Sequence, residues 1–229
     1  MASDLAMIPY TGRLSVSVDT LRQLANASKW QKITDLIAEE VQVLLGGHMD
    51  PVPLDIDYES STGSPAYYYR GAVYLCPHVW KEALDQGLMS QGELIDSVFI
   101  VLAHELSHAW QDQNTHILSD KKLEAIYEGQ AVFIQSIFAN MLGLAEVNKK
   151  GIAIQMDENY WLKQYASREK ALCKMSENTF SRFESAYFFY QHYLMGGMEK
   201  VKHIVHNPPD HDLLEQVIRN PYQYSELYE

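Results

Sequence analysis

The chain has 229 residues, 47% of them hydrophobic, and its 30 acidic residues outnumber its 18 basic ones, which gives a formal net charge of −12 at pH 7. A chain of this length can bury a sizeable core, and the negative charge disfavours nucleic acids and anionic membranes as partners. Neither a signal-peptide pattern nor the roughly 20 apolar residues of a membrane span is present. We therefore expect a protein that is cytoplasmic, or exported without a cleaved signal, for example as a translocated effector.

The N-terminal part predicts a helical hairpin. Apolar residues recur at helical spacing from Asp19 to Ala27 and again from Ser28 to Leu45, and Gly46-Gly47 supplies the stop. No motif in this part suggests chemistry, so we interpret the hairpin as scaffold. The two cysteines, Cys76 and Cys173, are far apart in sequence, and we expect two buried thiols without a disulfide.

Two stretches with strand character follow. Residues 54–58 alternate between apolar and acidic side chains, and after a turn cluster at 60–65 the tyrosine-rich stretch Tyr67–Leu75 contains many strand formers. We expect a small sheet whose last strand, 67–75, forms one wall of a cleft and offers backbone hydrogen bonds to an extended peptide. Alternatively, the tyrosines only cover a face of the sheet.

A central helix is predicted from about Ser90 to Gln113, after a short helix that Pro77 opens and Gly87 ends. Residues 98–102 are apolar around the whole helix, which indicates that the helix is buried. It continues into His-Glu-x-x-His, with His104 and His108 one turn apart on one face.

This motif suits a zinc ion. Two imidazoles at i and i+4 can both bind a tetrahedral Zn²⁺, and Glu105 stands beside the first of them, where it can take a proton from a bound water. The five-residue motif also occurs by chance in protein sequences, and its histidines and glutamate can then lie on a solvent-exposed face of a helix. The apolar run before the motif favours the metal, because buried polar groups need partners.

A third ligand must come from elsewhere in the chain. Glu128 lies on a helix predicted over 120–142 and is separated from His108 by residues 109–127, enough for a loop and a second helix packed on the first. Glu124, one turn earlier, is the chief competitor, and His116 is too close along the connector. In the extended motif His-Glu-x-x-His-x-x-Gly-x-x-His, position 111 would be glycine and position 114 would be a third histidine ligand. This chain has Gln111 and Asn114, which excludes a third ligand of that kind.

His104-Glu-Leu-Ser-His108 followed by Glu128 resembles the glutamate-zincins, the thermolysin-like metallopeptidases. Ala103-His-Glu-Leu-Ser-His-Ala-Trp-Gln-Asp-Gln113 with Tyr127-Glu-Gly-Gln-Ala131 is more closely similar to a set of largely uncharacterised zinc peptidases, over about residues 95–224. The resemblance implies that His104, His108 and Glu128 are zinc ligands and that Glu105 is the general base.

Two features depart from the thermolysin-like pattern. At the position of Val132 the thermolysin-like enzymes have an aspartate that orients a histidine ligand. In this chain another side chain must therefore accept the N–H of the imidazole nitrogen that does not bind the metal. Glu124 is our candidate for this partner. The sequence also does not identify the residue that stabilises the oxyanion of the tetrahedral intermediate. The possible donors are Tyr127, Arg182, Tyr187, Tyr190, His192 and His206.

The C-terminal part predicts helices with charged faces over 156–167 and 168–175, an aromatic helix from Phe180 that ends at Gly196-Gly197, and a last short helix near 213–217. We expect a single zincin-like domain over 1–229 with an α+β fold, mostly helical, in which a small sheet precedes the active-site helix. Its parts are the hairpin and sheet (1–89), the zinc-site helices (90–145) and the helical C-terminal part (146–229).

These features predict a zinc-dependent peptidase that hydrolyses peptide or protein substrates. The alternative is a catalytically inactive zinc domain that binds a protein partner through the former cleft. Glu105 counts against the alternative, because a purely structural site needs no base beside its ligand and is usually closed by a fourth protein ligand.

Overall fold

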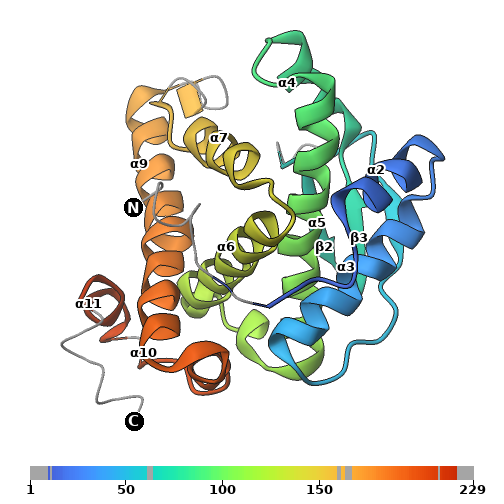
Figure 1. Ribbon diagram of the computed structural model, residues 1–229. Helices are drawn as coiled ribbons and strands as arrows, with labels where there is room; N and C mark the ends of the chain where they lie inside the picture. The colour runs from blue at the N-terminus through green and yellow to red at the C-terminus, as the bar shows by residue number, and fades with distance from the viewer. Residues whose placement is uncertain are drawn as a thin grey trace.

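The computed structural model (Figure 1) describes residues 10, 12–60, 64–158, 161–162, 167–210 and 212–220. Most of these residues are helical, and three short strands form one sheet, so the expected mostly helical α+β fold is confirmed. None of the helices in the described ranges combines the length and the apolar character that a membrane crossing requires.

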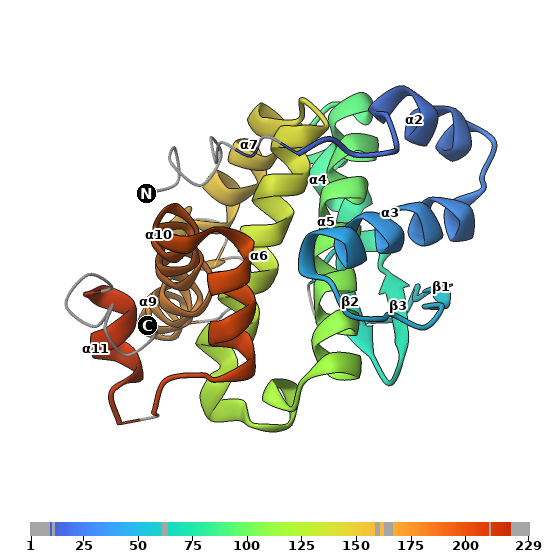
Figure 2. The ribbon, with the colours of Figure 1, turned by 60° about the horizontal axis from the view of Figure 1, so that its bottom comes forward.

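The N-terminal hairpin consists of α2 (Val18–Asn26) and α3 (Trp30–Leu45). Ser17 caps α2 by accepting the backbone N–H of Thr20, and Gly46 ends α3 with a positive φ of 71°. Helix α3 packs against the central helix α5 (Gln91–Asn114), and Figure 2 shows it crossing in front of α5. The hairpin was therefore predicted correctly, and it serves as a cover for α5.

The sheet has three strands, β1 (Leu54–Ile56), β2 (Ala66–Tyr69) and β3 (Ala72–Leu75), in the order β1-β3-β2. Strand β1 is parallel to β3, and β2 is antiparallel to it. The stretch 67–75 is thus a hairpin and not one strand, because Arg70 and Gly71 both adopt positive φ, 49° and 85°, and reverse the chain in two residues. The last strand, β3, is central in the sheet and presents no free edge, whereas β2 is an edge strand that packs against α5.

The central helix begins as expected. Ser90 and Glu93 form a reciprocal capping box at the N-terminus of α5, and the short helix α4 (Pro77–Asp85) precedes it. After α5, two 3₁₀ turns, η1 (Ile117–Ser119) and η2 (Lys121–Leu123), lead to α6 (Glu124–Met141). Helix α6 starts at Glu124 and not at 120, because Asp120 caps the 3₁₀ turn by accepting the N–H of Lys122.

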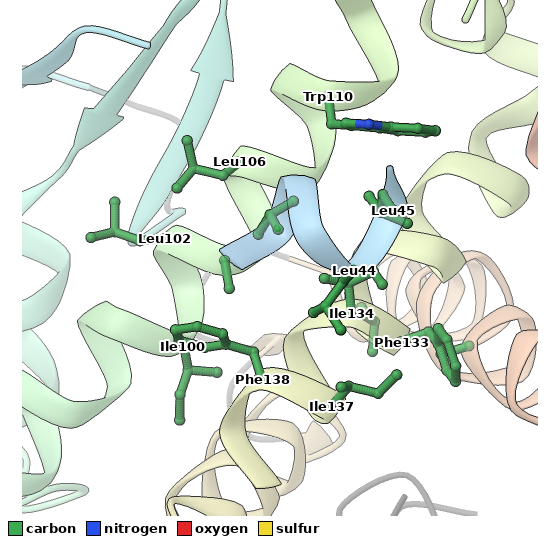
Figure 3. Packing of buried hydrophobic residues seen from close by; sticks show 14 of the residues in the cluster. Leu44, Leu45, Ile100, Leu102, Leu106, Trp110, Phe133, Ile134, Ile137 and Phe138 are labelled. Atoms are coloured by element: carbon green, nitrogen blue, oxygen red, sulfur yellow. The ribbon is translucent and has the colours of Figure 1, made fainter. Parts of the chain in front are cut away.

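The core lies where α3, α5 and α6 meet. Figure 3 shows the apolar side chains of these three helices interdigitating there. The largest of them are fully or almost fully buried: Trp110 on α5 and Phe133 and Phe138 on α6. This packing fixes α6 against α5, and Figure 2 shows that α6 runs back alongside α5 after the turn.

The C-terminal part contains α7 (Ala145–Gln155), α9 (Arg168–Asn178), the π-helical turn η3 (Thr179–Glu184), α10 (Ser185–His206) and α11 (Leu214–Arg219). Gly196 and Gly197 leave helical geometry and kink α10, so the expected stop is real but helical residues continue beyond it. The helix expected over 156–167 falls partly on 159–160 and 163–166, which lie outside the described residues. Cys76 is buried as expected, but Cys173 is exposed, because α9 buries only Ala171.

Candidate metal centre

Helices α5 and α6 bring three metal-ligating side chains together. The Nε2 atoms of His104 and His108 lie 3.2 Å apart, and each is 3.5 Å from a carboxylate oxygen of Glu128. All three side chains are largely withdrawn from solvent. Glu124, the alternative third ligand, and His116 are both exposed and lie outside this cluster. The fold therefore brings the residues of the sequence prediction into one group.

The spacing of the candidate ligand atoms is close to what a zinc ion requires. A regular tetrahedron with metal–ligand distances of about 2.0–2.2 Å has edges of about 3.3–3.6 Å. The two Nε2 atoms are 3.2 Å apart, and each lies 3.5 Å from a different oxygen of Glu128, Oε2 for His104 and Oε1 for His108. These separations are close to those edges. Within the described residues the cluster has three protein ligands and not four, which is the arrangement of an open, catalytic zinc site.

Burial sets the protonation of the first histidine. It lowers the pKa of His104 to about 4, because a charged imidazole loses its hydration there. Burial acts the same way on His108, but the Glu128 carboxylate outweighs it and raises the pKa of His108. Burial would raise the pKa of Glu128, yet the charges of Arg182 and His108 hold it well below its usual value. The cluster thus has an ionised carboxylate beside a neutral imidazole.

Gln111 orients the second histidine. Its side-chain oxygen lies 2.8 Å from Nδ1 of His108, and its amide nitrogen donates to the backbone oxygen of Tyr127 and to Oε1 of Gln130. Our prediction that Glu124 accepts an imidazole N–H is wrong for His108, since the i+3 residue on the same helix already does so. The His-x-x-Gln spacing in the sequence could have indicated this partner. Among the described residues, Nδ1 of His104 has no hydrogen-bond partner.

Glu105 lies between the metal cluster and the edge strand β2. Its carboxylate is buried and accepts the backbone N–H of Tyr68 at 2.8 Å. Burial raises its pKa to about 7, and the nearby charge of Glu128 adds to the rise. A buried carboxyl group with such a pKa, next to a metal ligand, can exchange protons near neutral pH.

Two of the six possible oxyanion donors lie at the cluster. Nε of Arg182, on the π-helical turn η3, is 2.9 Å from Oε2 of Glu128. The ring of Tyr127 is 5.8 Å from that of His108, and burial raises the pKa of its phenol to about 12, so it stays a donor at neutral pH. For the other four, the structure gives ring contacts with residues outside the cluster: Tyr187 with Tyr190, His192 with Phe188, and His206 with Trp110.

We compared the chain with protein-family models, with curated proteins and with solved structures, and none of the three comparisons finds a match. The assignment of a function to this centre therefore depends on its residues and their geometry.

Proposed function

We propose that the protein is a zinc-dependent peptidase. The observation that carries the proposal is the close grouping of His104, His108 and Glu128, at separations of 3.2 and 3.5 Å, with the buried carboxylate of Glu105 beside them. A three-ligand site leaves room for a water or a substrate, and a base next to it has a role only if a proton moves.

His104, His108 and Glu128 would hold the zinc ion. The bound ion would supply a Lewis acid that polarises a peptide carbonyl and lowers the pKa of a water molecule. Glu105 would accept the proton of that water and deliver it to the leaving amine. Gln111 would keep His108 in the tautomer whose Nε2 faces the metal, by accepting the Nδ1 proton.

An extended peptide would lie along β2. This strand is at the edge of the sheet, and Tyr68 directs its N–H away from β3, to Glu105 on α5. Edge strands bind extended peptides through backbone hydrogen bonds. Arg182 and Tyr127 are the side chains that could donate to the oxyanion, because they are the proposed donors that lie at the cluster.

The substitution Glu105→Gln tests the proposal. It keeps the shape of the side chain and the three ligands but removes the base. We expect about one zinc per chain in both proteins and a loss of about 10²–10⁴-fold in hydrolysis, measured by mass spectrometry on a mixture of unrelated peptides.

The control is Glu124→Gln, which makes the same change on an exposed side chain one turn before Glu128. It should leave zinc content and hydrolysis unchanged. A Glu105→Gln protein that hydrolyses peptides like the wild type would exclude the mechanism. Zinc in the wild type without hydrolysis would favour the inactive zinc domain, and no zinc after reconstitution would exclude both.

A further inference from the structure

The sheet turns one face to α5 and the other to solvent. Ala66, Val73 and Leu75 point to the inner face and are buried, whereas the residues that alternate with them on β2 and β3 are half-buried or exposed. Figure 2 shows the sheet at the margin of the molecule, beyond α5. Among the described residues of the strands, the outer face carries Asp55, Tyr67, Tyr69, Ala72 and Tyr74.

Three of these residues form a row across the strands. In the register of the sheet, Tyr74 on the central strand has Tyr67 on one side and Asp55 on the other. The rings of Tyr67 and Tyr74 are stacked, with their centroids 5.0 Å apart and their planes inclined by 13°. This separation nearly equals the spacing of about 4.8 Å between neighbouring strands, so the ring faces are turned toward the adjacent strands. One face of Tyr74 therefore covers Tyr67, and the other is directed to Asp55.

The surroundings of this row are acidic. Asp55, Asp57 and Glu59 lie in β1 and the segment directly after it. Tyr67 donates its phenol hydrogen to Oδ2 of Asp57 at 2.6 Å, and this hydrogen bond lowers the pKa of the Asp57 carboxyl group. Arg70 is the one basic residue in the three strands and the β2–β3 turn. The charges beside the row therefore favour a cationic partner.

The choice of cation follows from the two groups that face each other. Tyr74 offers the face of a ring, and Asp55 offers an exposed carboxylate whose Oδ1 accepts the backbone N–H of Ile56 at 2.8 Å. A guanidinium group can stack flat on a ring and pair with a carboxylate at its edge, whereas an ammonium group is a compact charge without a flat face. The sheet already contains one such contact, since Cζ of Arg70 lies 5.0 Å from the ring centroid of Tyr69. The row thus fits arginine better than lysine.

We propose that the outer face of the sheet binds an arginine side chain of a partner protein, stacked on Tyr74 and paired with Asp55. An extended segment with several arginines fits this face, because Asp57 and Glu59 can attract further cations. Glu105 belongs to α5, on the inner side of the sheet. The inference therefore concerns a second surface and does not depend on the proposed peptidase function.

The test uses three fluorescently labelled heptapeptides, in which serine alternates with arginine, with lysine or with citrulline. Lysine keeps the charge without the flat guanidinium group, and citrulline keeps the shape without the charge. Dissociation constants are measured by fluorescence anisotropy at low ionic strength, where exposed charges are least screened. Mass spectrometry after each titration checks that the peptide is intact, and circular dichroism checks that each variant is folded.

We expect the wild type to bind the arginine peptide at least about threefold more tightly than the lysine peptide, and at least about tenfold more tightly than the citrulline peptide. Tyr74→Leu should lose the preference for arginine over lysine, because it removes the ring face. Tyr74→Phe keeps the ring face and should keep the preference.

Asp55→Asn tests the carboxylate on an exposed side chain that the fold does not need. It should weaken binding of the arginine peptide at least about threefold. The control Asp212→Asn removes the same charge from an exposed position just before α11, which Figures 1 and 2 show on the opposite side of the molecule from the sheet. It should leave the dissociation constant within about twofold of the wild type.

Four results would overturn the inference. Equal affinities of the wild type for the arginine and lysine peptides would indicate only general attraction to a negatively charged chain. A preference that persists in Tyr74→Leu would place the arginine site elsewhere, and a preference lost in Tyr74→Phe would exclude stacking on the ring as its cause. Equal effects of Asp55→Asn and Asp212→Asn would exclude Asp55 as the paired carboxylate. None of these results bears on zinc binding or hydrolysis.

Discussion

Gln111 is a fully buried residue that joins the candidate metal centre to the next helix. Its amide oxygen faces His108, and its amide nitrogen donates to the backbone of Tyr127, next to Glu128. One side chain thus contacts one candidate ligand, His108, and the segment that carries another, Glu128. Such outer partners usually contribute strongly to metal affinity.

We predict that Gln111→Leu weakens zinc binding by about 10–100-fold, the range found for partners of metal-bound histidines. Leucine fills the space but leaves the Nδ1 proton of His108 and the carbonyl of Tyr127 without their partner. The measurement is a competition titration with a zinc chelator. It reports on metal affinity directly, without a substrate.

Gln113→Leu is the matched control. It makes the same chemical change two positions further along α5, where the amide oxygen accepts only the backbone N–H of Asp50 at the surface. Zinc affinity should stay at the wild-type value in this variant. Equal affinities in the Gln111 and Gln113 variants would show that Gln111 does not position His108.

At the scale of elements, Gly129 sets how closely α6 and η3–α10 approach. A Cβ atom at this position would lie 2.4 Å from Cβ of Ser185 and 2.8 Å from its backbone carbonyl carbon. No real side chain fits at these distances, and the backbone contact cannot be relieved by a rotamer change. Glu128 directly precedes Gly129, so the close contact between Gly129 and Ser185 also holds the Glu128 carboxylate near Arg182.

We predict that Gly129→Ala lowers the free energy of unfolding by about 1–3 kcal/mol, the usual cost of overpacking. This loss would appear although alanine favours a helix by about 1 kcal/mol over glycine. Urea unfolding followed by circular dichroism measures it. Gly151→Ala, at an open helical position, should instead raise the unfolding free energy, and the prediction fails if both variants shift in the same direction.

The elements that the sequence predicts best are those whose signals are local. The capped start of α5 at Ser90, the hairpin α2–α3 and the break at Gly196-Gly197 all follow from periodicity, caps and glycines. The β2–β3 hairpin was missed because Arg70 adopts a positive φ, which is uncommon for this residue type. The strand propensity of residues 67–75 shows no interruption there.

At the scale of the whole molecule, the candidate site could be predicted only in part. The spacing of His104 and His108 places them together on any helix, and Glu105 comes with them. Glu124 and Glu128 lie one turn apart on the same face of α6, so the choice between them depends on how far α6 is shifted along α5, and the packing of the two helices decides this shift. A cavity of about 450 Å³ between α4, α5, α6 and α7 needs four helices at once, so no stretch of sequence indicates it.

The three ligands come from two helices that form the centre of the core, so zinc binding should stabilise the whole fold. A ligand that binds only the folded state adds about 2.7 kcal/mol at a free concentration 100 times its Kd. For a chain of this length, each kcal/mol shifts the Tm by about 2–4 °C. We therefore predict that removal of zinc with a chelator lowers the Tm by about 5–10 °C, measured by differential scanning calorimetry.

Variants of the centre separate specific binding from zinc bound weakly at the surface. His108→Ala should have the same Tm with and without zinc, because it lacks one of the three ligands. Glu105→Gln keeps all three and should show the full wild-type shift. A zinc-dependent shift in His108→Ala as large as that of the wild type would place the stabilising ion elsewhere, for example among the exposed acidic groups of this negatively charged chain. A shift confined to proteins with all three ligands would mean that the metal holds α5 and α6 together.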